Sequence, residues 1–180
     1  MLRIVILIWA IPNLCFSQNH FPHLKAHAHN DYEHERPLWN ALEHGFISVE
    51  VDVHLTDGRL LVSHNRPKPD ALTLQQLYLA PLDSLLSRHN DSIYPSDEHV
   101  FYLMIDSKTE GESTYRAIQK EVARFESLRC TKSHCPVKIF ISGNRAVVNE
   151  YVLLTWLLDE TVSFGVIEPF DLARYLGHKT

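Results

Sequence analysis

Polar residues gather at the ends of short apolar runs, and this pattern constrains the fold of the chain more than any other feature. The run 47–54 alternates valines with Ser48, Glu50, Asp52 and His54. Side chains two residues apart on a strand share a face, so Glu50 and Asp52 point the same way. Similar polar clusters accompany three other runs, at 27–32, 63–65 and 106–108. The pattern predicts strands with one apolar face and polar groups near their ends.

Strand-like and helix-like segments alternate along the chain. Strands are expected at 23–29, 47–54, 59–64, 100–107, 137–142 and 161–167, and helices at 37–43, 73–87, 112–129 and 151–158. This alternation is typical of a parallel α/β sheet, and polar strand ends are typical of α/β barrels. We therefore expect a TIM-type (β/α) barrel, incomplete at the C-terminus because a full barrel takes roughly 250 residues. An open doubly wound sheet is the alternative, but no glycine-rich phosphate loop follows the first expected strand.

The first 17 residues have the pattern of a secretory signal peptide. Arg3 supplies a positive charge, an apolar stretch runs from Ile4 to Ile11, and Ser17 is a small residue before the expected cut at Gln18. The stretch is shorter than the roughly 20 residues of a transmembrane helix. We expect residues 18–180 to form one exported domain, periplasmic or extracellular, with no transmembrane segment after cleavage. A short buried N-terminal strand is the alternative interpretation.

Composition excludes one class of partner. The chain of 180 residues is 45% hydrophobic and 22% charged, as expected for a globular domain. Its formal net charge of −5 becomes more negative when Arg3 is removed, so no nucleic-acid partner is expected. Cys130 and Cys135 either close a small disulfide loop in an oxidising compartment or remain free thiols. A zinc site that adds His134 to these cysteines lacks a fourth ligand.

The polar clusters together contain the ligands of one hard divalent cation. Glu50, Asp52 and Asp106 supply carboxylate oxygens, and Asn30 can add a carbonyl oxygen. Mg²⁺ and Ca²⁺ prefer oxygen ligands of this kind. A cation at this place would offset the charge on a phosphodiester, which otherwise repels a nucleophile.

The same clusters contain groups for proton transfer and for anion binding. His29 and His64 belong to different expected strands, so they can flank a phosphate and transfer protons on opposite sides of it. Lys108 would hold a phosphate oxygen as a point charge. His27 shares a strand face with His29 and is a possible further site residue.

Four motifs resemble those of the phosphatidylinositol-phospholipase-C-like phosphodiesterases, which include glycerophosphodiester phosphodiesterases and venom sphingomyelinases D. Residues 29–32, His-Asn-Asp-Tyr, resemble the His-Asn-Thr-Tyr of eukaryotic phospholipases C, whose His is catalytic and whose Asn contacts the metal. Residues 49–53 are similar to the Glu-x-Asp metal pair, 61–64 to the segment of the second catalytic His, and 105–108 to the Asp-Leu-Lys or Glu-Ile-Lys segment. The run 24–65 is most similar to the altered inheritance of mitochondria protein 6 branch.

The resemblance covers about residues 24–145 and implies a secreted, metal-dependent phosphoric diester hydrolase. Its expected substrates are glycerophosphodiesters or lipid headgroups, cleaved by two-histidine acid/base catalysis with one Mg²⁺ or Ca²⁺. Attack by a neighbouring substrate hydroxyl would then give a cyclic phosphate. Asn30 stands where glycerophosphodiesterases have an Arg, and the last strands of the family are not recognisable after Arg145.

Two alternatives remain at this stage. His27 and His29 also match the His-x-His pair of an amidohydrolase-like zinc hydrolase, although the later acidic clusters fit zinc poorly. The second alternative is an inactive, truncated member of the phosphodiesterase family, or a binding protein that has kept the site.

Overall fold

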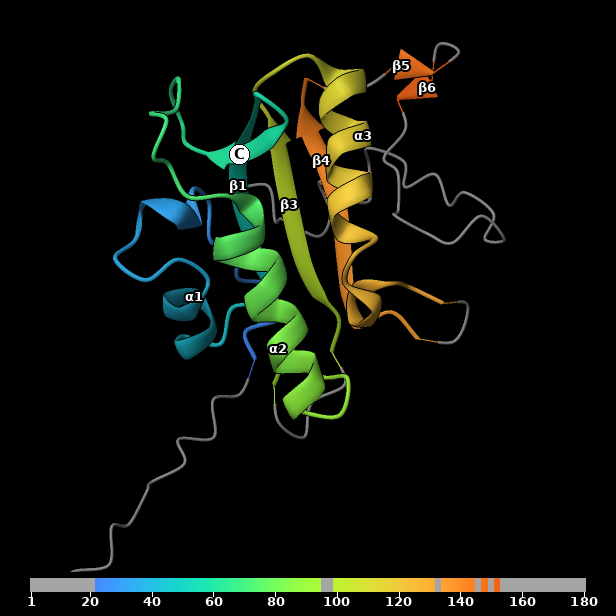
Figure 1. The fold of residues 1–180 in the computed structure, drawn as a ribbon. Coiled ribbons are helices and arrows are strands. Elements are labelled where there is room, and N and C mark those ends of the chain that lie inside the picture. The colour runs from blue at the N-terminus through green and yellow to red at the C-terminus, as the bar shows by residue number, and fades with distance from the viewer. Residues whose placement is uncertain (1–21, 95–98, 132–133, 145–146, 149–150, 153–180) are drawn as a thin grey trace, which may run out of the picture.

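The computed structural model describes residues 22–94, 99–131, 134–144, 147–148 and 151–152. Its main sheet has four strands in the order β2-β1-β3-β4 (Figure 1). They are β1 (Ser48–Thr56), β2 (Arg59–Val62), β3 (Phe101–Ser107) and β4 (Val137–Gly143). β1, β3 and β4 are parallel, and β2 is antiparallel to β1.

The helices are short. They are the 3₁₀ turn η1 (Asp31–Glu33), α1 (Trp39–Glu43), the π-helical η2 (Gln75–Leu79) continuing into α2 (Ala80–Arg88), α3 (Gly111–Val122) and the 3₁₀ turn η3 (Glu126–Leu128). The strands β5 (Val147–Val148) and β6 (Tyr151–Val152) form a separate antiparallel pair. None of the helices in the described part of the chain has the length and apolarity of a membrane span.

The expected TIM-type barrel is wrong, because the four-stranded sheet is mixed and open. The departure begins at β2, which pairs with β1 in the antiparallel direction. Asp57 and Gly58 between them both have positive φ angles, 50° and 74°, as in a two-residue hairpin turn. A hairpin joins antiparallel neighbours, whereas a (β/α) barrel needs parallel strands joined by crossover helices.

The expected first strand, 23–29, is also wrong as a continuous strand. It is reduced to two isolated parallel bridges, His23 to Phe46 and Ala28 to Val49. A turn interrupts it, since the Ala26 N–H donates to the His23 carbonyl at 2.9 Å. The second bridge still brings His29 beside the middle of β1, which matters for the site.

The other strand and helix predictions have different outcomes. The strands expected at 47–54, 59–64, 100–107 and 137–142 are confirmed as β1, β2, β3 and β4, and the helices expected at 37–43, 73–87 and 112–129 correspond to α1, η2 with α2, and α3 with η3. The helix expected at 151–158 is wrong where it begins, because Tyr151–Val152 form β6. The expected signal peptide and the strand expected at 161–167 lie outside the described residues.

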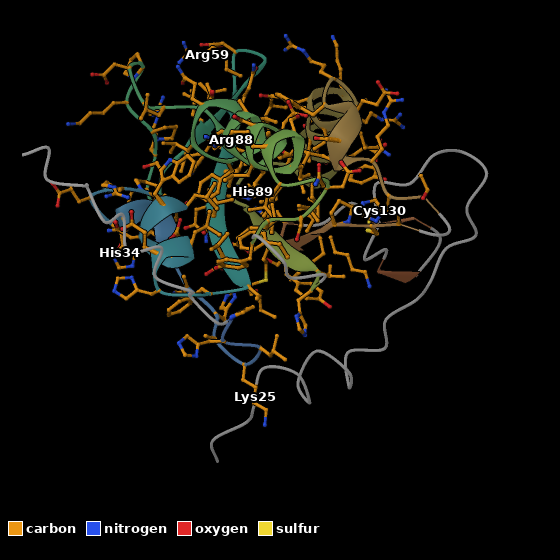
Figure 2. All side chains as sticks on the ribbon, turned by 90° about the horizontal axis from the view of Figure 1, so that it is seen from below. Lys25, His34, Arg59, Arg88, His89 and Cys130 are labelled. Atoms are coloured by element: carbon orange, nitrogen blue, oxygen red, sulfur yellow. A yellow bond between two sulfur atoms is a disulfide. The ribbon has the colours of Figure 1, made fainter. Side chains whose placement is uncertain are left out.

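One face of the sheet is covered by α2 and α3 (Figures 1 and 2). Val49, Val51 and Val53 of β1 are fully buried and belong to one core cluster with Leu82 of α2 and Ile118 of α3. Burying an aliphatic side chain of this size contributes about 1.5–3 kcal/mol. A one-residue slip would place these valines on the opposite face, so the core fixes the register of β1. Glu50 and Asp52 consequently face away from the helices.

A buried carboxylate fixes the turn that leads into α1. Asp31 is fully buried, and its Oδ2 accepts hydrogen bonds from the Leu38 N–H at 2.5 Å and from the Tyr78 hydroxyl at 2.8 Å. Burial raises the pKa of Asp31, and the two hydrogen bonds offset only part of this effect. Asp31 therefore ties η1 to α1 and η2, next to the residues that enter the site.

Asp31→Ala should lower the free energy of unfolding by about 2–4 kcal/mol, because it leaves two buried donors without an acceptor. Asp31→Asn keeps an acceptor oxygen and should be tolerated. A folded-state pKa above the ordinary value of 3.8 means that Asp31 stabilises the fold at low pH and loses this contribution as pH rises. Urea unfolding at several pH values should therefore show that the free energy of unfolding of the Asn variant increases relative to that of the parent as the pH rises toward neutrality. A stability difference that does not change with pH would contradict this account.

Cys130 and Cys135 form a disulfide in the structure. This is one of the two states expected from the sequence, and it closes the loop that leads into β4. The pair provides no thiolates for a zinc site with His134.

Candidate active site

The register of the parallel strands brings the polar clusters to one place. Asp52 of β1 lies opposite Asp106 of β3, and Asp106 lies opposite Ser142 of β4. The three residues form one row across the sheet, in the middle of β1 and near the carboxyl ends of β3 and β4. Glu50 precedes Asp52 by two residues on β1, so its side chain is on the same face of the sheet. Residues far apart in sequence thus become neighbours through strand pairing alone.

Glu50, Asp52 and Asp106 each offer a carboxylate oxygen within 4.8 Å of the others. Glu50 and Asp52 are buried, and the side chain of Asp106 is 14% exposed. Three close carboxylates repel one another strongly in a partly desolvated site unless a cation offsets their charge. We call these three residues the carboxylate group.

The two oxygens of Asp52 have different surroundings. Oδ2 lies 2.8 Å from the Tyr32 hydroxyl, 2.8 Å from Nδ1 of His64 and 3.1 Å from Nζ of Lys108. Within the described residues, Oδ1 is buried and has no hydrogen-bond partner. A buried carboxylate oxygen without a partner costs free energy, unless a ligand such as a cation binds it. The residues therefore fit a hard divalent cation.

Each candidate catalytic histidine contacts a different carboxylate. Nδ1 of His64 donates to Asp52, which leaves Nε2 for proton transfer. Nε2 of His29 lies 3.1 Å from Oε2 of Glu50. The side chains of His64 and His29 are 55% and 71% exposed, in contrast to the buried carboxylates. A substrate can thus reach both imidazoles from solvent.

The turn 29–32 positions two polar side chains, Asn30 and Tyr32. The sequence alone predicted a role for Asn30 but none for Tyr32. Asn30 has a left-handed backbone, φ 51°, and its N–H donates to Oε2 of Glu50 at 3.3 Å. The Tyr32 hydroxyl lies 3.2 Å from Oδ1 of Asn30 as well as 2.8 Å from Asp52. Burial and the neighbouring Asp52 raise the pKa of Tyr32, so the hydroxyl keeps its proton and donates it. Tyr32 belongs to the motif at 29–32, but only the register of β1 shows what it contacts.

Lys108 pairs with two members of the carboxylate group. Its Nζ contacts Oδ2 of Asp106 and lies 3.1 Å from Oδ2 of Asp52. Burial alone would lower the pKa of Lys108, but the hydrogen bonds to Asp106 and Asp52 outweigh it and raise the pKa. The ammonium group is therefore charged at neutral pH.

Gly143 lets the end of β4 approach Asp106. It has a φ of +70°, and a Cβ there would lie 2.6 Å from Oδ1 of Asp106 and 2.6 Å from the Ser107 carbonyl oxygen. The same Oδ1 accepts a hydrogen bond from Ser142 at 2.7 Å. No side chain fits between β4 and the carboxylate, so Gly143 sets the position of Asp106.

Gly143→Ala should destabilise the fold and displace Asp106. Backbone strain at a positive φ costs about 1–3 kcal/mol, and the contact with Asp106 adds to it. Gly58→Ala is the matched control, because Gly58 has a φ of +74° but nothing within 4 Å of its Cβ position. Urea unfolding and calorimetric Mg²⁺ titration should show a larger stability loss for Gly143→Ala, and weaker cation binding in that variant alone. Equal losses in the two variants would mean that the close approach to Asp106 is unimportant.

His27 lies outside the carboxylate group. Its Nδ1 lies 2.8 Å from the hydroxyl of Ser48, the residue two positions before Glu50 on β1. Burial, together with nearby His29, lowers the pKa of His27, so its imidazole is neutral at neutral pH. The group of possible metal ligands found among the described residues contains three carboxylates and no histidine. This arrangement does not favour the amidohydrolase alternative.

The site joins buried oxygen ligands to exposed imidazoles on one face of the sheet, an arrangement suited to metal-assisted hydrolysis. The chain belongs to the family of the AIM6-like phosphodiesterase domain, whose sequence model matches residues 16–134. The resemblance expected from the four motifs is thereby confirmed at the level of the family.

Several fungal relatives are similar over the same region. "Altered inheritance of mitochondria protein 6" of Lachancea thermotolerans is 39% identical over 106 residues, 51% of this chain and 25% of that protein. The Saccharomyces cerevisiae protein of that name (strain ATCC 204508 / S288c) is 34% identical over 119 residues, 58% of this chain and 30% of that protein. An Arthroderma benhamiae homolog is 34% identical over 116 residues, 54% of this chain and 37% of that protein.

This chain thus spans 25–37% of the length of these curated relatives. No solved structure gives a significant match to it.

Proposed function

We propose that the chain is a metal-dependent phosphoric diester hydrolase that acts on glycerophosphodiesters or lipid headgroups. The observation that carries this proposal is the carboxylate group, whose three side chains offer oxygens within 4.8 Å of one another. His29 contacts one of these carboxylates, Glu50, and His64 contacts another, Asp52. Membership of a phosphodiesterase family supports the reaction class.

Glu50, Asp52 and Asp106 would hold one Mg²⁺ or Ca²⁺, with Asn30 able to add its carbonyl oxygen. When bound, the cation supplies charge neutralisation of the phosphodiester and lowers the pKa of a coordinated hydroxyl. The chain's own residues bind and orient the substrate around it.

The exposed histidines would transfer the protons of the reaction. One imidazole takes the proton of the attacking hydroxyl and the other gives a proton to the leaving oxygen. Contacts with Glu50 and Asp52 hold His29 and His64 in place. In a substrate with a hydroxyl next to the phosphate, attack by that hydroxyl would release a cyclic phosphate; in a substrate without one, such as bis-(p-nitrophenyl) phosphate, water would be the nucleophile. Lys108 would bind a non-bridging phosphate oxygen.

Hydrolysis of bis-(p-nitrophenyl) phosphate and glycerophosphocholine by the purified chain tests the proposal. Activity should require added Mg²⁺ or Ca²⁺ and should be lost with a chelator. Activity that survives chelation of Mg²⁺ and Ca²⁺ but follows tightly held zinc would favour the amidohydrolase alternative. Cation binding without turnover would favour an inactive member of the family.

Export is a separate proposal, supported by the pattern of residues 1–17. Mass spectrometry of the secreted or periplasmic protein should find Gln18 at or near the mature N-terminus. An intact Met1 in a cytosolic fraction would contradict export.

A further inference from the structure

The ammonium group of Lys108 lies between two candidate metal ligands. It contacts Asp106 Oδ2 and is 3.1 Å from Asp52 Oδ2, and Asp52 is almost fully buried. A lysine that served only to bind substrate would gain nothing from this position, because the carboxylates draw it away from an incoming phosphate. Its place suggests a second role.

We propose that Lys108 is an internal counter-cation of the carboxylate group and competes with the divalent cation for Asp52 and Asp106. The inference rests on the proposed metal site and adds a regulatory residue to it. Three carboxylates and one ammonium carry a formal charge of minus two, which one divalent cation neutralises. Lys108 thereby limits cation affinity while it stabilises Asp52, whose charge would otherwise be buried without a cationic partner.

A consequence is coupling between cation and phosphate. A divalent cation on Asp52 and Asp106 weakens their attraction for the Lys108 ammonium. The flexible lysine side chain can then turn to a phosphate oxygen. Because coupling between two binding sites is reciprocal, phosphate binding should also strengthen cation binding.

The competition predicts that removal of the lysine charge increases cation affinity, whereas removal of a metal ligand would decrease it. Lys108→Met and Lys108→Gln should bind Mg²⁺ and Ca²⁺ more tightly than the parent, roughly tenfold to hundredfold, because a nearby positive charge is removed. Lys108→Arg keeps the charge and should stay close to the parent. Lys120→Met removes a lysine from the exposed face of α3 and should change nothing. Isothermal titration calorimetry measures all five proteins.

Two further measurements check that the variants fold and that phosphate binding depends on Lys108. Circular dichroism melting checks that each variant folds, and Lys108→Gln keeps a hydrogen-bond donor near Asp52 if Lys108→Met does not fold. Dimethyl phosphate is then titrated into each cation-loaded protein. Its affinity should fall in Lys108→Met and Lys108→Gln, so that cation and phosphate affinities move in opposite directions.

The outcomes separate this inference from the proposed function. If Glu50→Gln weakens cation binding in the parent background but the neutral Lys108 variants bind no more tightly, the metal site stands and the competition is refuted. If the parent binds neither Mg²⁺ nor Ca²⁺, the metal site is wrong and the competition falls with it. Tighter cation binding with unchanged phosphate affinity would refute the coupling.

Discussion

Replacement of Glu50 by Gln together with Asp52 by Asn will abolish the binding of Mg²⁺ and Ca²⁺ and, with it, phosphodiester cleavage. Both side chains are buried on the same face of β1, and each belongs to the carboxylate group. Neutral amides leave Asp106 as the single anionic ligand of the group. Divalent cations bind one carboxylate weakly in water, so calorimetry should detect no heat of binding.

The fold of this double variant should survive. Removal of two close negative charges relieves repulsion when no cation is bound, and the amide oxygen introduced by Asp52→Asn can still accept from Tyr32 and Lys108. Glu43→Gln with Asp57→Asn is the matched control, because it removes the same two charges at exposed positions. The control should bind cations and turn over like the parent. If the double site variant did the same, the proposed metal site would be wrong.

The sequence predicted that Glu50, Asp52, Asp106 and Lys108 lie close together, but not the shape of the sheet that brings them together. Alternation along 47–54 gave Glu50 and Asp52 a common face, and the same reasoning applied to Asp106 and Lys108. The parallel pairing of β1 with β3 then places Asp52 opposite Asp106 on the face that these local patterns predict. The structure places all of these residues within one group of contacts.

The differences between the expected barrel and the structure have one local cause and one that depends on distant strands. The local cause is the dipeptide Asp57-Gly58, which favours a two-residue hairpin between antiparallel strands, whereas a barrel requires parallel ones. Closure of a sheet depends on pairing between distant strands, which composition and periodicity do not specify. Gly143 was missed for a similar reason: only the register of β3 against β4 shows that its missing Cβ makes room for Asp106.

Removal of either exposed imidazole will lower turnover by roughly 10²- to 10⁴-fold, the usual contribution of a positioned general acid or base. His29→Ala and His64→Ala should keep cation affinity nearly unchanged, because the carboxylate group and Asn30 remain. His27→Ala is the control, since His27 bonds Ser48 outside the group. It should lose much less activity.

The choice of substrate then assigns the two roles. A p-nitrophenolate leaving group needs little protonation, whereas the glycerol or choline oxygen of glycerophosphocholine needs it strongly. The variant that lacks the general acid should therefore be far less impaired on bis-(p-nitrophenyl) phosphate than on glycerophosphocholine, while the variant that lacks the general base should be impaired on both. Both imidazoles contact a carboxylate, but the contact of His64 Nδ1 with Asp52, at 2.8 Å, is shorter than that of His29 with Glu50, at 3.1 Å, and Asp52 is the more buried carboxylate. A base oriented by a buried carboxylate has this arrangement, so we expect His64 to be the base and His29 the acid. Equal loss on both substrates in both variants would show that neither imidazole protonates the leaving oxygen, and the two-histidine mechanism would have to be abandoned even if the metal site were correct.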